Sequence, residues 1–143
     1  MSTYFNLIEY LKKQHVLSLC ATNGKDLWCA NCFYVFNETD TSFLLMTEVK
    51  TRHSQLMLQN SQVAGTVNCQ QKTILLIKGI QYSGQIVLLN DKRKWQAQRA
   101  YQKRFPIAKK VSTALWEIII DEMKMTNNML GFGKKIIWHR SKS

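Results

Sequence analysis

The segment FLLMTEVKTRH, residues 43–53, decides the architecture that this sequence predicts. Its first half is apolar and typical of a buried strand, and a helix-type pattern begins where it ends. Thr51, Arg52 and His53 stand at that change. The free backbone N–H groups of a helix start, next to a hydroxyl and a cation, make an anion-binding site. The junction therefore predicts a pocket for a phosphate group.

Two β-type runs precede this segment. Residues 16–22 lead into Asn23-Gly24, a strong hairpin turn because both residues tolerate a positive φ. Residues 27–36 form the return strand, and a second turn at residues 37–40 leads to a third strand at 41–47. We therefore expect three antiparallel strands joined by tight turns.

Helical and β-type patterns alternate after the junction. Residues 51–60 predict a short helix with Leu56 and Met57 facing inward. The remaining strands are expected at residues 63–69, 73–89, 114–121 and 134–138. Gly79 and Gly84 interrupt the second of these, and glycine within a strand often marks a bulge or bend.

Two further helices are expected at the periphery. Residues 3–14 carry apolar side chains at helical spacing and end in two lysines, which suit a helix C-terminus. Residues 91–105 form a basic helix, which the sole proline, Pro106, brings to an end. Its apolar face is composed of Ala97, Ala100, Tyr101 and Phe105.

These elements predict a mainly β fold in a single domain over residues 1–143. Six or seven antiparallel strands close most naturally into a small barrel, because closure removes exposed strand edges. The short helices then lie around the barrel.

The net charge of +11 is unevenly distributed along the chain. Residues 1–90 hold 7 Lys and Arg against 5 Asp and Glu, whereas residues 91–143 hold 13 against 4. This asymmetry indicates an anionic partner or, alternatively, a solvated basic face. The basic helix with Trp95 and Tyr101 is the best nucleic-acid candidate, but it carries no sequence-specific binding motif, so we expect a phosphorylated small molecule instead.

Several classes of protein are disfavoured by the sequence. No stretch is long and apolar enough to cross a bilayer and no signal peptide is evident, so we expect a cytoplasmic protein without membrane contact. The four cysteines are then free thiols, and Cys29 and Cys32 point to opposite faces of a strand, which argues against a metal or redox pair. No nucleophile motif or paired carboxylates indicate a hydrolase, and no catalytic residue is assigned.

Residues 131–135, GFGKK, look like a phosphate-binding fragment but lack the Walker spacing and precede a strand. We interpret them as a hairpin turn. The hypothesis that Trp138, His139 and Arg140 reach a cofactor across a subunit interface stays open, because aromatic and arginine side chains are enriched at interfaces.

The chain resembles the FMN-binding split-barrel superfamily that includes pyridoxamine 5′-phosphate oxidase, and within it the bacterial YhbP family. Five segments carry this resemblance: residues 27–36 (LWCANCFYVF), 45–53 (LMTEVKTRH), 63–66 (VAGT), 77–84 (IKGIQYSG) and 130–135 (LGFGKK). It implies a mainly β split barrel of six or seven antiparallel strands with short peripheral helices.

The resemblance also implies a cofactor and a site. In the superfamily the strand and helix start around this junction hold the FMN phosphate, at positions that match Thr47, Thr51, Arg52 and His53, the last standing where the oxidases carry lysine. Lys78 is a further candidate. The superfamily is homodimeric, with two flavin sites at the interface, and flavin would supply electron-transfer chemistry. The alternative is a non-catalytic barrel that has lost flavin and contacts an anionic ligand or nucleic acid.

Overall fold

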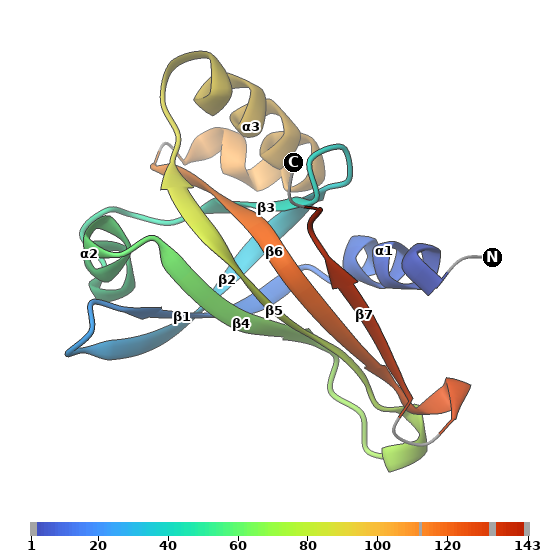
Figure 1. Cartoon of the computed structure of the whole chain (residues 1–143). Coiled ribbons are helices and arrows are strands. Elements are labelled where there is room, and N and C mark those ends of the chain that lie inside the picture. The colour runs from blue at the N-terminus through green and yellow to red at the C-terminus, as the bar shows by residue number, and fades with distance from the viewer. Residues whose placement is uncertain (1–2, 112, 132–133, 142–143) are drawn as a thin grey trace.

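The computed structural model describes residues 3–111, 113–131 and 134–141. Its strands are β1 (Val16–Thr22), β2 (Leu27–Asn37), β3 (Ser42–Met46), β4 (Gln62–Asn68), β5 (Lys78–Leu88), β6 (Leu115–Asn127) and β7 (Lys135–His139). They form one antiparallel sheet in the order β3-β2-β1-β4-β5-β6-β7, and a further pairing of β3 with β6 closes six of them into a barrel (Figure 1). The split barrel expected from the sequence is confirmed, with β7 outside the closure.

Strand β6 makes the split. Its first half pairs with β3 over residues 115–119, and its second half pairs with β7 over residues 122–126. Arg140 bridges the point where the two partners part. Its Nε donates to the Ile120 carbonyl at 2.8 Å, and its Nη2 donates to the carbonyls of Asp40 and Thr41 at 2.9 and 2.8 Å. The end of β7 is thereby fixed to the barrel.

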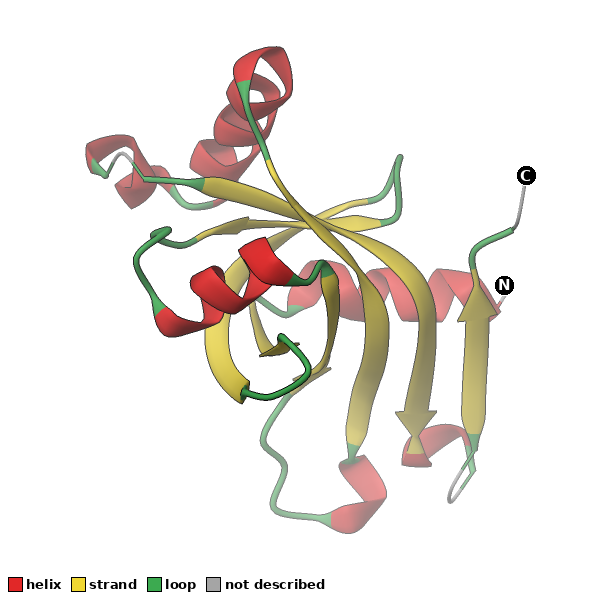
Figure 2. Ribbon diagram, turned by 60° about the vertical axis from the view of Figure 1, so that its left-hand side comes forward, coloured by secondary structure: helices red, strands yellow, loops and turns green. Residues whose placement is uncertain are grey.

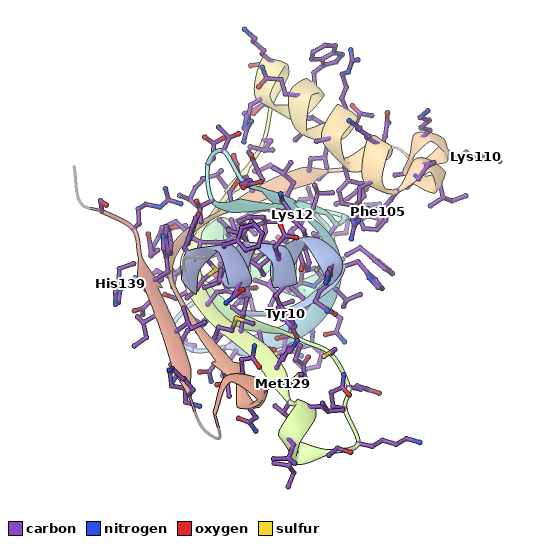
Figure 3. All side chains as sticks on the ribbon, turned by 90° about the vertical axis from the view of Figure 1, so that its right-hand side faces the viewer. Tyr10, Lys12, Phe105, Lys110, Met129 and His139 are labelled. Atoms are coloured by element: carbon purple, nitrogen blue, oxygen red, sulfur yellow. The ribbon has the colours of Figure 1, made fainter. Side chains whose placement is uncertain are left out.

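Three α-helices accompany the sheet: α1 (Thr3–Lys13), α2 (Arg52–Gln59) and α3 (Asp91–Arg104). Helices α1 and α2 lie at opposite ends of the barrel (Figures 1 and 2). Helix α1 buries Leu7 and Leu11 completely, and the Tyr10 hydroxyl donates to the Lys78 carbonyl at 3.1 Å (Figure 3). No described helix is long and apolar enough to cross a membrane.

Helix α3 packs on the outside of the barrel over its own apolar cluster. The cluster consists of Leu44, Leu89, Ala97, Tyr101, Ala108 and Leu115. An ion pair also holds α3 to the barrel: Arg93 of α3 donates to the two carboxylate oxygens of Glu117 on β6 at 3.1 and 2.5 Å. Glu117 is buried and also accepts from Ser42 Oγ. A separate, larger core fills the barrel and includes the fully buried Phe43 and Ile118.

The expected strand over residues 73–89 begins later than predicted, at Lys78. Residues Ile74–Leu76 instead form a 3₁₀ turn, η1, and are exposed to solvent. The physical reason is pairing: β4 ends at Asn68 and β6 ends at Asn127, so neither neighbour extends beyond Lys78.

The two glycines of this strand behave differently. The register with β6 shifts between Ser83 and Gly84, which confirms the expected bulge. A Cβ on Gly84 would lie 2.3 Å from the Ile119 carbonyl oxygen, so the two backbones could not approach with any larger residue. Gly79 sits in continuous register, so no bulge occurs there.

Two other strands differ from expectation. Strand β6 runs to Asn127 rather than residue 121, because Met123 and Met125 continue to face the core while the residues between them face outward. Strand β7 follows a short 3₁₀ turn, η3 (Asn128–Leu130), and a tight turn in which the Lys134 amide donates to the Gly131 carbonyl at 2.9 Å. Residues 132 and 133 of the GFGKK segment lie outside the described residues.

Candidate functional site

The junction between β3 and α2 is a capped helix start. Thr51 has extended backbone angles, and its Oγ1 accepts from the Ser54 amide at 3.2 Å, as an N-cap does. Its own amide donates to the Glu48 carbonyl at 3.3 Å. The next two amides, of Arg52 and His53, have no hydrogen-bond partner among the described residues. Two of the orphan donors of a helix start are therefore available to an anion.

The buried side chain of His53 connects the two parts of this junction. Its Nε2 lies 2.9 Å from Thr47 Oγ1 and 3.2 Å from Thr51 Oγ1, so one ring nitrogen joins the strand end to the helix cap. Burial lowers the pKa of His53, and the ring is neutral at pH 7. The side chain thus positions the two threonine hydroxyls and adds no fixed charge.

Thr47 is held by backbone contacts as well. Its amide donates to the Ala114 carbonyl at 3.1 Å, and its own carbonyl accepts from Trp116 Nε1 at 3.0 Å. Trp116 is fully buried. The end of β3 is therefore fixed to the barrel core, and Thr47 in turn contacts the residues of the helix cap through His53.

Arg52 supplies the positive charge. Its guanidinium carbon lies 4.0 Å from the centre of the Trp28 ring on β2, a cation–π contact across the junction. Over the described residues, no carboxylate lies within ion-pair distance of Arg52. The cation is therefore positioned by an aromatic ring and remains free to pair with an anion.

Lys78 is not part of this junction within the chain. It begins β5 beside Gly79, which pairs with Asn68 at the far end of β4, whereas α2 leads into the near end of β4 at Gln62. Seven residues of strand separate the two places, a distance of about 20 Å. Lys78 instead lines a cleft of about 780 Å³ together with Asn68, Gln81 and Thr126.

Four of the five residues proposed from the sequence thus come together: Thr47, Thr51, Arg52 and His53. Sequence reasoning missed Trp28 and Ser54. Ser54 follows from the Thr51 cap, because an N-cap side chain bonds the amide three positions on. Trp28 carries no such local signal, because its contact with Arg52 depends on how α2 packs against the β1–β2 hairpin.

The C-terminal residues Trp138, His139 and Arg140 are engaged within the chain. Arg140 is tied to three carbonyls at the split, and Trp138 stacks on Tyr4 with ring centres 6.3 Å apart. His139 Nδ1 lies 3.4 Å from a carboxylate oxygen of Glu122. They hold β7 and the residue after it against the barrel and contribute to the packing of α1.

Comparison with known proteins identifies the family. No family model matches the chain. A UPF0306 protein of Yersinia pestis is 57% identical over 132 residues, which cover 92% of this chain and 90% of that protein. The chain belongs to the UPF0306 family.

Solved structures show that this UPF0306 chain shares its fold with proteins of low sequence identity. The heme-binding protein from Mycobacterium smegmatis has a TM-score of 0.76 at 13% identity, and the match covers 92% of the UPF0306 chain and 56% of that protein. An FAD-binding protein from Mesorhizobium loti has a TM-score of 0.69 at 14% identity, with 87% and 94% covered. At such identities the likeness establishes the split-barrel fold.

Proposed function

We propose that this UPF0306 protein binds FMN at a homodimer interface and acts as a flavin-dependent oxidoreductase. The observation that carries the proposal is the start of α2, where two unpartnered amides lie next to an arginine that no described carboxylate neutralises. A phosphate monoester matches this donor set, because helix-start amides and a guanidinium both favour a dianion. The flavin-binding and heme-binding structural relatives support a cofactor in this barrel.

Each residue has a defined part in this proposal. Arg52 pairs with the phosphate, and Thr51 shapes the helix start that presents the amides. Thr47 and His53 keep the Thr51 hydroxyl in place through the shared Nε2 contact. The isoalloxazine ring, when bound, would supply the redox chemistry.

A second copy of the chain completes the site in this proposal. Lys78 and the end of α2 lie at opposite ends of the seven-residue strand β4, about 20 Å apart along the strand, so Lys78 would act on the cofactor held by the partner. The exposed run at residues 74–77 supports such a contact, because Ile74 and Leu75 are 62% and 63% exposed. Light scattering on the purified protein tests this step, and a monomer at micromolar concentration would contradict it.

Heme is the competing cofactor, and the histidines argue against it. A histidine that serves as the axial ligand needs an imidazole nitrogen that faces an open cavity. His53 is buried and its Nε2 already contacts two hydroxyls, while His15 and His139 are exposed on separate elements. These positions favour FMN over heme.

FMN titration tests the proposal, read as quenching of flavin fluorescence. We expect saturable binding that Arg52→Ala weakens about 10- to 100-fold, the loss of one charge-assisted interaction. Arg99→Ala is the matched control, because Arg99 also stacks on an exposed tryptophan, Trp95, at 4.8 Å. It should leave the affinity unchanged.

A parallel titration with hemin and with a short RNA separates the alternatives. FMN binding that Arg52→Ala does not affect would place the cofactor elsewhere. No FMN binding together with salt-sensitive RNA binding would support a non-catalytic module that uses its basic half, which is the alternative function. Helix α3 and Lys109 would then be the contact, because they line a depression of about 650 Å³ with Trp95 and Arg99.

A further inference from the structure

Two cysteines that are nine residues apart in sequence meet on the outer face of the barrel. Cys20 on β1 and Cys29 on β2 are directly opposite each other in the antiparallel register, and their sulfur atoms are 2.8 Å apart. Cys29 is exposed and Cys20 is partly exposed. Neither takes part in the junction at α2, because Trp28, which contacts Arg52, points to the opposite face of the strand.

The position in the ladder brings these thiols as close as a β-sheet allows. The Tyr34 amide donates to the His15 carbonyl at 3.0 Å, so residues 15 and 34 are a hydrogen-bonded pair. Counting along the register makes Cys20 and Cys29 a non-hydrogen-bonded pair, in which the Cα atoms approach to about 4.5 Å. That separation is at the short end of the range that a disulfide spans.

We propose that Cys20 and Cys29 form a reversible dithiol–disulfide pair that hydrogen peroxide oxidises. The thiolate of Cys29 attacks one peroxide oxygen, the O–O bond breaks, and Cys29 becomes a sulfenic acid. The other oxygen leaves as hydroxide, which takes up the proton that the Cys29 thiol released and becomes water. The sulfur of Cys20 then attacks the Cys29 sulfur, the S–S bond forms, the S–O bond breaks, and the Cys20 proton leaves with the hydroxyl as a second water. Two thiols are oxidised and one peroxide is reduced.

The environment assigns different parts to the two thiols. The hydrogen bond with Cys29, together with burial, raises the pKa of Cys20 to about 11. Cys20 therefore keeps its proton at neutral pH, and the more exposed Cys29 is the thiol that reacts with peroxide. Cys20 is the resolving thiol.

The fold favours a reversible bond. A disulfide between directly opposed strand residues departs from relaxed geometry, and strained or exposed disulfides are the ones that reductants open readily. The bond would close the hairpin whose turn, at Asn23-Gly24, already has a compact shape, with the Asn23 side chain accepting from the amides of Lys25 and Asp26 at 2.9 and 2.7 Å. Oxidation therefore requires no rearrangement of the barrel.

Peptide mapping tests the proposal, because Lys25 lies between the two cysteines. Trypsin separates Cys20, in the peptide of residues 14–25, from Cys29, in the peptide of residues 26–50. After one equivalent of hydrogen peroxide, we expect these peptides to be joined in the full-length wild-type protein and to separate on reduction. In the same sample, two of the four thiols should become resistant to alkylation under denaturing conditions until a reductant is added.

Matched variants identify the atoms involved. Cys29→Ser should abolish the joined peptides, and Cys32→Ser, which lies in the same peptide but faces the core, should leave them unchanged. Cys20→Ser should leave a sulfenic acid on Cys29 that dimedone traps. A disulfide through Cys32 or Cys69, a disulfide between two chains, or oxidation of Cys29 to sulfinic acid without any joined peptide would overturn the proposal.

Discussion

Helices α2 and α3 both place an arginine on an exposed tryptophan, yet only α2 offers an anion site. Helix α3 is rich in lysine and arginine, but an acidic residue, Asp91, lies in its first turn. The first turn of α2 has no acidic residue, and its cap leaves two amides open beside Arg52. The difference shows that a specific anion site arises where unpaired backbone donors and a cation lie together. A helix face that is only rich in basic residues is hydrated and need not bind a particular anion.

The two helices are also fixed to the barrel by different forces. Helix α2 buries Leu56 and Met57 in the barrel core, so apolar contact holds it. Helix α3 depends on a smaller cluster and on the ion pair between Arg93 and the buried Glu117. This contrast gives three predictions, beginning with the largest effect.

Removing the anchor of α3 should cost the most stability. Arg93→Met leaves the buried Glu117 carboxylate without its cation, and we expect the free energy of unfolding to fall by about 3 kcal/mol, measured by urea denaturation. Arg99→Met removes an arginine from the same helix that pairs with no described carboxylate, and it should change stability by less than about 0.5 kcal/mol. Adding Glu117→Gln to Arg93→Met should restore much of the loss, and no recovery would contradict the ion-pair interpretation.

Substitutions at the N-caps of α2 and α3 should change the free energy of unfolding by less than Arg93→Met does, and by different amounts. Thr51→Ala removes a side chain that accepts from the Ser54 amide, and we expect a loss of about 1 to 2 kcal/mol in the same denaturation experiment. Asn90→Ala is the matched variant, because Asn90 is the N-cap of α3 but makes no capping hydrogen bond. Its substitution should cost only a few tenths of a kcal/mol. A loss of only a few tenths of a kcal/mol at Thr51 as well would show that its side chain does not hold α2.

The smallest effect concerns pH. Burial lowers the pKa of His53 below its usual 6.5, so below that pH the unfolded chain binds a proton that the folded chain does not. The His53 contribution to stability is therefore complete above pH 6.5 and is lost as the pH falls through the lowered value. Thermal melting from pH 7.5 to 5 should show this slope in the wild type and a shallower one in His53→Gln. An identical slope would mean that His53 does not titrate with folding.

Most of the fold followed from local patterns in the sequence. Strand β1 begins and ends where the apolar run and the Asn23-Gly24 turn predict, and α2 lies within one residue of its predicted bounds, 51–60, at each end. The prediction that residues 74–77 belong to a strand was wrong. Their apolar side chains are typical of a strand, but both neighbouring strands end before they reach these residues. Pairing partners, rather than propensity, determine where a strand ends.

The candidate site was also predictable only in part, because some of its contacts depend on tertiary packing that local sequence does not show. Thr51, Arg52 and His53 are consecutive, so their meeting is a local property of a helix start. The stacking of Arg52 on Trp28 depends on tertiary packing. The pairing of Cys20 with Cys29 was within reach, because the register of a hairpin follows from its turn and that turn was correctly placed.

The Arg140 bridge at the split has a consequence for the order in which the structure opens. Among the described strands, β7 pairs with β6 alone. Beyond that pairing, Arg140 after its end donates to the carbonyls of Asp40 and Thr41, and Trp138 stacks on Tyr4 of α1. No described strand pairs with its outer edge. We therefore expect β7 to be the first strand to exchange its amide hydrogens in the native state, while the closed six-stranded barrel stays protected. The C-terminal strand would then open as a cooperative unit of its own, separate from a barrel that is closed without it.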